Sequence, residues 1–322
     1  MATSRHARLP LQAAGQRLDQ ALAELFPDYS RTRLTTWLRA GAVRVDGLPA
    51  LPRQRVRGGE QVSIDVPQER IVPLAPEPIA LDLRHVDGDL LVLVKPAGLV
   101  VHPGAGNPAG TLQNALLHFD PDLAGLPRAG IVHRLDKDTT GLMVVARSQR
   151  AHTALTAMIA AREISRQYAA IVRGALIAGG EVRAAIGRHP QDRQRQAVRA
   201  GGAGRPALTH YRVRERFRAH TLLQCNLETG RTHQIRVHMA HLGHPLVGDP
   251  LYGGGLRLPR GAGPALIAAL RGFGRQALHA ERLAFAHPFG GELLRFDAEP
   301  PADFLALLAT LRADATDDVD RA

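Results

Sequence analysis

Two carboxylates stand two positions apart in the segment richest in side chains that can do chemistry. Residues 130–146 read GIVHRLDKDTTGLMVVA, in which Asp136 and Asp138 flank Lys137. A carboxylate can act in a reaction as a nucleophile or as a proton acceptor. An isolated Asp-x-Asp pair is more often structural, because one carboxylate accepts hydrogen bonds from the backbone of its own turn. The spacing alone leaves open which aspartate reacts and which one closes the turn.

Histidines offer a second kind of chemistry further along the chain. His233, His238, His241 and His244 fall within twelve residues, and histidine is the commonest metal ligand, so a histidine-based metallohydrolase is one interpretation. The segment lacks His-Glu-x-x-His, the single cysteine is remote, and the fourth histidine follows a glycine that should end the helix. RNA contact or helix packing is the more ordinary use of these histidines. We therefore expect no metal.

The elements that position these residues indicate an α+β fold. Apolar runs predict strands over residues 90–94, 141–146, 168–172 and 222–227, and helical spacing predicts helices over residues 149–162, 232–242, 265–273 and 303–312. The turn-rich segment with the two aspartates lies directly before one of these strands, which gives it a rigid base. Strands and helices do not alternate as in repeated βαβ units, and there is no dinucleotide fingerprint or P-loop. A nucleotide cofactor is not expected.

The helix predicted over residues 232–242 should expose one side. Thr232 can serve as its N-cap and Gly243 as its terminator. Its buried stripe should consist of Ile235, Met239 and Leu242. Arg236 would then leave the helix on the opposite, exposed side.

A proline-rich stretch divides the chain. Before it, apolar spacing predicts a helix over residues 17–26, a second helix with Ser30 as its N-cap, and strands between residues 43 and 66. Residues 67–78 contain four prolines, so we predict an extended linker over residues 67–79. The remainder should form one larger domain over residues 80–314, followed by a polar tail over residues 315–322.

Excess positive charge favours a polyanionic partner such as nucleic acid. The 41 lysines and arginines outnumber the 30 acidic residues, giving a net charge of +11, although an arginine-rich genome would produce the same composition. Seven arginines stand against one acidic residue between residues 31 and 57, where a solvated charged surface is the alternative to a phosphate-binding face. Residues 188–206 add five arginines against one acidic residue, which suits either a mobile arm over RNA phosphates or a solvated loop.

No segment of the sequence indicates export or membrane insertion. Residues 1–15 are partly basic but lack the apolar stretch of a signal peptide. Residues 96–119 carry no charged side chain, yet seven glycines and prolines would break a membrane helix there. Cys225 has no partner for an intrachain disulfide, which fits a reducing cytoplasm. A cytoplasmic protein is the prediction.

Several segments, taken together, resemble two known families. The run from His133-Arg-Leu-Asp136 to Gly141 resembles the catalytic motif of the RluA-type pseudouridine synthases. Three further parts match the same family in the same order: LVKPAG with VHPGAGN in residues 93–107, RQYAA in residues 166–170, and LETGRTHQIRVH with GHPLVGDPLY in residues 227–252. Residues 16–66 resemble the S4-type RNA-binding domain. The resemblance implies a small helix-helix-strand domain followed by a synthase domain with a central mixed, largely antiparallel sheet flanked by helices.

The resemblance also implies an activity and its residues. Enzymes of this family detach uracil from its ribose within RNA and reattach it through carbon, without a metal or organic cofactor. The reactive aspartate of the family corresponds to Asp136, which leaves Asp138 as the turn residue. The active-site tyrosine corresponds to Tyr168, and the active-site arginine corresponds to Arg236.

Physical reasoning agrees with these roles. The carboxylate of Asp136 must stay ionised, either to attack C1′ of the ribose or to remove a proton from C2′. A guanidinium within about 4–6 Å lowers the pKa of a carboxylate and fixes its orientation, which is the role expected of Arg236. Tyr168 can form a flat wall for a flipped base and take the proton from C5, although a tyrosine of pKa near 10 is a reluctant base at neutral pH. A tyrosine in this apolar setting is otherwise most often part of the core.

The expected substrate is large-subunit (23S) ribosomal RNA. GRHP in residues 187–190 and RPALTHY in residues 205–211 resemble the subgroup that acts on this RNA, although the stretch from Gln194 to Gln196 departs from it. The expected RNA contacts are Arg31, Arg33, Arg39, Arg134, Lys137, Arg188, Arg231 and His233. We expect a monomer that binds ribosomal RNA, either free or within assembling ribosomes. The alternatives are an enzyme of this family acting on other ribosomal or transfer RNA uridines, and a non-catalytic ribosome-assembly factor.

Overall fold

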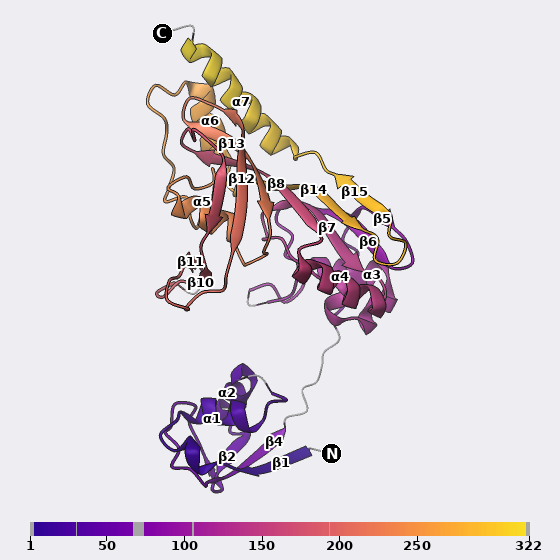
Figure 1. Cartoon of the computed structure of the whole chain (residues 1–322), viewed down its shortest axis with the longest axis vertical. Coiled ribbons are helices and arrows are strands. Elements are labelled where there is room, and N and C mark those ends of the chain that lie inside the picture. Colours follow the sequence, from indigo (N-terminus) through magenta and orange to yellow (C-terminus); the bar gives the residue numbers. More distant parts are fainter. Residues whose placement is uncertain (1–2, 30, 67–73, 105, 193, 320–322) are drawn as a thin grey trace. The chain divides into compact units, whose positions relative to one another are not determined.

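Two compact units make up the protein, with the division between residues 73 and 74. The structure is a computed structural model that describes residues 3–29, 31–66, 74–104, 106–192 and 194–319. Figure 1 follows the chain from the smaller unit, in indigo, to the C-terminal helix in yellow. No helix among the described residues is long and apolar enough to cross a membrane.

The smaller unit packs two helices on a four-stranded sheet of order β1-β4-β2-β3. Its elements are β1 (Thr3–Arg8), α1 (Leu18–Leu25), α2 (Arg31–Arg39), β2 (Val43–Val45), β3 (Leu48–Pro49) and β4 (Gln61–Val66). The helices and strands predicted here are present, with Leu22, Trp37 and Ile64 in the core. Strand β1 pairs along the whole of β4, so the unit begins before the predicted boundary at residue 16. The predicted N-cap, Ser30, lies outside the described residues.

The linker prediction is wrong for residues 74–79. Leu74 and Ile79 pack against the main core of the larger unit. The carbonyl oxygen of Ala75 accepts a hydrogen bond of 2.8 Å from the Asn114 side chain, and Glu77 accepts one of 2.9 Å from the backbone of Gly110. Residues 74–79, which include Pro76 and Pro78, therefore pack against the larger unit and do not form an extended linker. Residues 67–73 lie outside the described part of the chain.

The larger unit is built on a nine-stranded sheet, in which β15 pairs with β14 and the other strands follow the order β5-β6-β7-β14-β8-β13-β12-β9. The strands are β5 (Asp82–Val86), β6 (Leu90–Lys95), β7 (Thr140–Ala146), β8 (Ser165–Arg173), β9 (Gly180–Arg183), β12 (Leu208–Arg216), β13 (His220–Leu227), β14 (Leu278–Ala286) and β15 (Leu293–Asp297). Only β7 and β14 run parallel among the described pairs. The prediction of a mixed, largely antiparallel sheet is confirmed.

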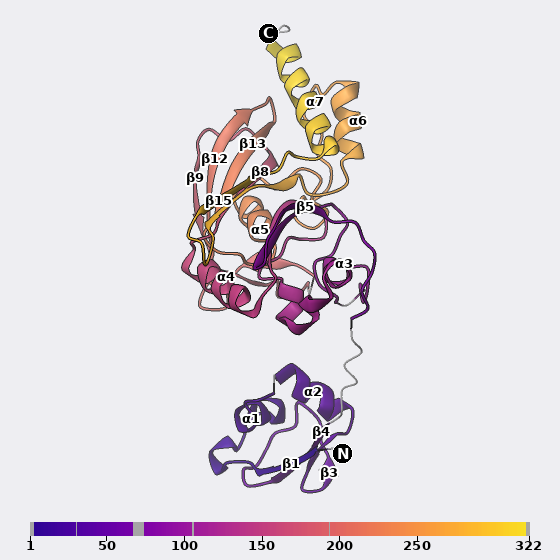
Figure 2. The ribbon, with the colours of Figure 1, turned by 90° about the vertical axis from the view of Figure 1, so that its right-hand side faces the viewer.

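Helices flank this sheet, and a separate hairpin extends from it. The helices are α3 (Leu112–Phe119), α4 (Gln149–Ala161), α5 (Gln234–His241), α6 (Pro264–Gly272) and α7 (Ala302–Val319), and the hairpin consists of β10 (Ile186–Arg188) and β11 (Gln196–Val198). Helices α6 and α7 lie side by side in both views (Figures 1 and 2). Helix α7 continues to Val319, so the polar tail predicted over residues 315–322 is helical as far as residue 319.

Both faces of the central strands are buried. On β7, Met143 and Val145 belong to one apolar cluster, whereas Leu142 and Val144 belong to another. Successive side chains of a strand point to opposite faces, so this division shows a core on each side of the sheet. The strand that follows the two-aspartate segment is therefore fixed from both sides.

Candidate active site

Glycines fix both ends of the segment that carries the two aspartates. Gly130 has φ +79°, and a Cβ there would lie 1.9 Å from the carbonyl oxygen of Ala146 on β7. Gly141 has φ +116°, and a Cβ there would lie 2.2 Å from the carbonyl oxygen of Ala280 on β14. Only glycine combines this backbone conformation with so close an approach. The loop of residues 131–139, called the aspartate loop below, is thereby tied to two neighbouring strands.

A buried lysine binds the backbone of the aspartate loop. The ammonium group of Lys95 donates hydrogen bonds to the carbonyl oxygens of Pro96, Leu99 and Lys137, at 2.6, 3.0 and 2.8 Å. Burial lowers the pKa of Lys95 to about 7, against the opposing effect of the nearby Asp138 charge. Three acceptors match the three hydrogens of an ammonium group, so the geometry favours the charged form. Lys95 stood within a motif of the sequence, but nothing there indicated this supporting role.

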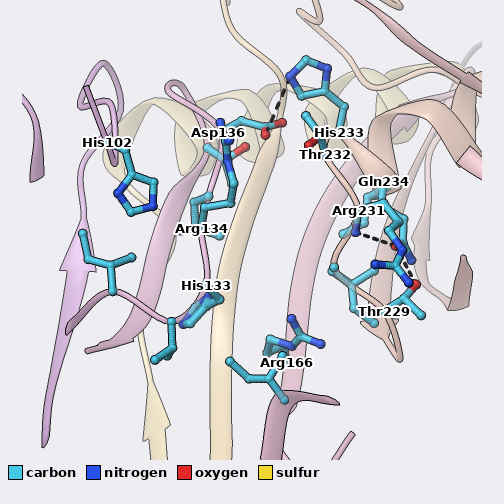
Figure 3. Close-up of a pocket in the computed structure, with 18 of the residues that line it drawn as sticks. His102, His133, Arg134, Asp136, Arg166, Thr229, Arg231, Thr232, His233 and Gln234 are labelled. Carbon is cyan, nitrogen blue, oxygen red and sulfur yellow. Dashed lines mark hydrogen bonds and ion pairs between the residues drawn. The ribbon is translucent and has the colours of Figure 1, made fainter. Parts of the chain in front are cut away.

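The two aspartates have different surroundings. Asp136 lines a cavity of about 990 Å³, whose wall also includes residues 131–135, Tyr168 and residues 227–236. Figure 3 shows Asp136 and His233 facing each other across part of this cavity. Asp138 does not line the cavity. Within the described residues its carboxylate accepts no hydrogen bond from the backbone of its turn. Its predicted capping role is therefore absent from the geometry, whereas Asp136 is the carboxylate open to a ligand.

Arg236 joins Asp136 to a second, fully buried aspartate. Its Nη1 donates to Oδ2 of Asp136 at 3.0 Å, while Nε and Nη2 donate to the two oxygens of Asp249 at 2.7 and 2.9 Å. Burial disfavours the guanidinium charge, but the bonds to Asp249 and the charge of Asp136 outweigh burial and raise the pKa of Arg236. This arrangement fixes the plane of the guanidinium and directs its remaining edge at Asp136.

The prediction of an exposed Arg236 is wrong. Only 4% of its side chain is exposed, and Val237 and His238 on the same helix are buried as well. Leu242, predicted to be buried, is 37% exposed. Helix α5 also begins at Gln234 with His233 at its N-cap, rather than at Thr232. Most sides of the helix are buried. The prediction assumed one buried side and one exposed side, and it therefore assigned Arg236 to the wrong surroundings.

Asp249 is a residue of this arrangement that sequence reasoning missed. Its side chain is fully buried, and besides Arg236 its Oδ1 accepts the backbone N–H groups of Leu251 and Tyr252, at 2.9 and 3.0 Å. A buried carboxylate needs such a set of donors to remain charged. The residue stood within a quoted motif, but it lies 13 positions after Arg236, and no local periodicity links the two.

Tyr168 provides a wall of the cavity rather than a ready base. It lies on β8 and is almost fully buried. Burial raises the pKa of its phenol, the charge of Arg166 lowers it, and that of Asp136 raises it further. Proton abstraction by this phenol at neutral pH would therefore require a change in its surroundings, whereas the residue already lines the cavity.

Two unpaired donors belong to side chains that line the same cavity. The Nε2 atom of His133 accepts the backbone N–H of Val144 at 3.0 Å, and burial, with a smaller effect of the Arg166 charge, lowers the pKa of His133 to about 3. The ring is therefore neutral, and its hydrogen resides on Nδ1. Within the described residues, Nδ1 of His133 and Nε of Arg166 have no hydrogen-bond partner. Both side chains line the cavity (Figure 3), but these two atoms themselves are buried against protein.

The other predicted RNA contacts are divided among three places. Arg134, Arg231 and His233 line the cavity, whereas Lys137 and Arg188 are exposed outside its lining. In the smaller unit, Arg31 pairs with Asp19 at 2.8 Å, the Arg33 guanidinium lies 5.1 Å from the centre of the Trp37 ring, and Arg39 is exposed. The segment 188–206, predicted as a mobile arm or a solvated loop, includes the end of β10 and all of β11, which pair as a hairpin.

Two of the histidines considered as metal ligands bind protein groups instead. His238 bonds to the Thr209 hydroxyl and the Ala184 carbonyl, both at 2.9 Å, and His244 bonds to the carbonyl of Arg173 at 2.8 Å. In the described part of the chain, no group of three or more histidine, cysteine, aspartate or glutamate side chains could hold a metal ion.

Comparisons with known proteins connect this geometry to a family. Residues 89–241 match the family model described as RNA pseudouridylate synthase, and residues 16–62 match the S4 domain. The chain is 58% identical to a protein of Xanthomonas campestris, with 97% of this chain and 93% of that one covered. It is 54% identical to one of Escherichia coli strain K12, with 93% and 92% covered. Both relatives bear the name ribosomal large subunit pseudouridine synthase D.

A solved structure is similar as well. The human protein called RNA pseudouridylate synthase domain containing 4 matches 72% of this chain and 93% of its own, with a TM-score of 0.56 and 26% identity.

Proposed function

Since the chain belongs to the RNA pseudouridylate synthase family, we propose that it converts uridine to pseudouridine in the RNA of the large ribosomal subunit, with Asp136 as the reactive carboxylate. The protein is an RNA pseudouridine synthase. The observation that carries the assignment of Asp136 is its place in the cavity, with Arg236 bonded to one oxygen. The relatives named for the large ribosomal subunit, which match almost the whole chain, support the choice of RNA.

The cavity suits a uridine that has left the RNA stack. A base inside stacked RNA cannot be reached, so the enzyme must flip it into a pocket with a flat wall and a polar floor. Tyr168 supplies the wall, while the polar side chains of Arg166 and Gln234 line the same cavity and make it suitable for a polar base. Asp136 then either attacks C1′ or removes the C2′ proton, and uracil leaves as an anion. In the first route, C5 of the turned uracil displaces the Asp136 carboxylate from C1′. In the second route, C5 bonds to C1′ while Asp136 returns the proton to C2′. In both routes C5 then loses its proton to solvent and N1 gains one.

The RNA target can be tested by mapping pseudouridines in ribosomal and transfer RNA with and without the gene. We expect specific pseudouridines of large-subunit RNA to disappear on deletion. They should return with the wild-type gene but not with a gene encoding Asp136→Asn. A loss confined to transfer RNA or to the small subunit would assign a different substrate within the family. An unchanged map would favour a non-catalytic assembly factor.

The S4 domain is proposed to hold RNA away from the reacting base. Removing residues 1–66 should weaken RNA binding and make it less dependent on salt. The slope of log K against log salt concentration should become shallower by about 0.7–0.9 for each phosphate that the truncated enzyme no longer neutralises. Single-turnover activity at high RNA concentration should persist, because the larger unit has its own core and cavity. Filter binding at several salt concentrations measures the slope. A truncated enzyme with the wild-type slope would exclude phosphate binding by this domain.

We further propose that the enzyme acts in the cytoplasm as a monomer, on ribosomal RNA that is either free or within assembling ribosomes. The names of its relatives, which refer to the large ribosomal subunit, support ribosomal RNA as the substrate. The single, buried thiol of Cys225 fits the reducing conditions of the cytoplasm.

A further inference from the structure

The phenol of Tyr252 lies where the hairpin β10–β11 meets the active site. Only 8% of this residue is exposed, and it packs in a small apolar cluster with Ile186 of the hairpin and Val237 of α5. The catalytic scheme above gives it no role. Its neighbours nevertheless include a backbone group of the hairpin and two side chains of the active site.

The hydroxyl of Tyr252 has two hydrogen-bond partners. The backbone N–H of Gln196 in the hairpin donates to it at 2.8 Å, and Nδ1 of His233 lies 2.8 Å on its other side. A phenol has one hydrogen, and no third partner of this hydroxyl exists among the described residues. The hydrogen-bond network is therefore complete only if Tyr252 donates to Nδ1 of His233. The hydrogen of the neutral imidazole must then reside on Nε2.

That nitrogen faces the reactive carboxylate. Nε2 of His233 lies 3.8 Å from Oδ1 of Asp136, while Arg236 holds the other oxygen. Burial lowers the pKa of His233, with Asp136 opposing this effect, so the ring is neutral at pH 7. A neutral imidazole can present either an N–H or a lone pair to the carboxylate. An N–H is attracted to the negative oxygen, whereas a lone pair is repelled by it.

Two further contacts hold this arrangement. The guanidinium of Arg195 in the hairpin lies 5.4 Å from the centre of the Tyr252 ring, and that of Arg236 lies 5.0 Å from it. His233 itself has φ +58°, a left-handed conformation that a non-glycine residue keeps only when its surroundings enforce it. The hairpin, the tyrosine and both active-site residues thus form one packed unit.

We propose that Tyr252 is a positioning residue that ties the arginine-bearing hairpin to the active site, by keeping the hydrogen of His233 on the nitrogen that faces Asp136. The active site is then in its reactive arrangement only while the hairpin is docked. RNA that holds the hairpin through Arg188 or Arg199 stabilises the same state. The proposal rests on the assignment of Asp136 as the reactive carboxylate.

Removing the phenol oxygen tests the role of Tyr252. The variant Tyr252→Phe keeps the ring and its two guanidinium contacts, but leaves Nδ1 of His233 without a donor. We expect the single-turnover rate at saturating RNA to fall about tenfold, a loss equivalent to about 1.4 kcal/mol, while the Kd for RNA changes less than about threefold. Tyr211→Phe is the matched control, because Tyr211 is a partly buried tyrosine on β12 outside the cavity lining. A wild-type rate for Tyr252→Phe would overturn the proposal.

The backbone of Gln196 provides an independent variant. Gln196→Pro deletes the N–H that bonds to Tyr252, whereas Gln196→Ala keeps it. The proline variant should slow the chemical step as Tyr252→Phe does, and combining the two should add little, because both break one chain of hydrogen bonds. Equal losses in the alanine and proline variants would show that the side chain matters, and additive losses in the double variant would show two unrelated effects. Either result contradicts the proposal.

The position of the hydrogen can be observed without activity. In enzyme labelled with ¹⁵N-histidine and free of RNA, the ring signals of His233, identified by their loss in His233→Gln, should show a protonated Nε2 and an unprotonated Nδ1. In Tyr252→Phe the two forms should mix. A hydrogen on Nδ1 in the wild-type enzyme would refute the proposal even if Asp136 is essential. Activity retained by Asp136→Asn would instead refute the proposed function, whatever the state of His233.

Discussion

Replacing Asp136 with asparagine should abolish pseudouridine formation, with a loss on the order of 10⁴-fold or more, as for other residues that react directly with substrate. An amide can neither attack C1′ nor accept a proton from C2′. The change should cost at most about 1–2 kcal/mol of unfolding free energy, because the amide oxygen can still accept from Arg236, whose charge remains paired with Asp249. Single-turnover assays and thermal unfolding of the same preparation measure both quantities.

The matched control for this variant is two residues away. Asp138→Asn makes the same chemical change in the same loop, but Asp138 does not line the cavity, so it should keep most of the activity. The Kd for RNA should stay within about threefold of wild type in both variants, a change of less than about 0.7 kcal/mol. Appreciable turnover by Asp136→Asn, or inactivity of Asp138→Asn alone, would require exchanging the two roles.

Replacing Arg236 with lysine should be nearly as harmful, although the charge is kept. The guanidinium contacts both Asp136 and Asp249 with three separate nitrogens, and one ammonium group cannot reproduce that geometry. A displaced carboxylate commonly costs on the order of 100-fold in the chemical step. The loss should therefore appear in the single-turnover rate at saturating RNA, with little change in Kd.

Two variants separate positioning from folding. Arg218→Lys disturbs another arginine with two bonds to one aspartate, Asp314, but neither residue lines the cavity, so its chemical step should be normal. Asp249→Asn should slow the chemical step, because it leaves the guanidinium plane less firmly held. If Arg236→Lys reacts at the wild-type rate but binds RNA weakly, Arg236 is a phosphate contact rather than the partner of Asp136.

Local patterns in the sequence predicted most of the elements around the site but not how they enclose it. Strands β6, β7 and β8 contain continuous apolar runs, and β13 contains a largely apolar one, so their positions followed from composition. Arg236 was assigned to solvent because the spacing of apolar residues marks only one buried stripe on a helix. A helix enclosed on most sides buries polar residues too, provided that partners from distant segments satisfy them.

The same limit explains the other differences. Asp249, Tyr252 and the buried Lys95 act through partners that are fixed only when separate strands and loops meet. Residues 74–79 are rich in proline, which marks linkers and packed extended segments alike. The end of α7 is polar, but a helix can run past its apolar contacts as long as its own backbone hydrogen bonds continue.

The parallel pairing of β7 with β14 determines when the active site can form during synthesis. The hydroxyl of Thr140, at the end of the aspartate loop, bonds to His279, which lies 139 positions later in the chain. Until the ribosome has released β14, one edge of β7 has no neighbour, and the strand is a long apolar run. Contacts so distant in sequence form slowly and leave partly folded chains prone to aggregation. A nascent chain that ends before β14 therefore has all the proposed catalytic residues and yet lacks a strand that holds them together.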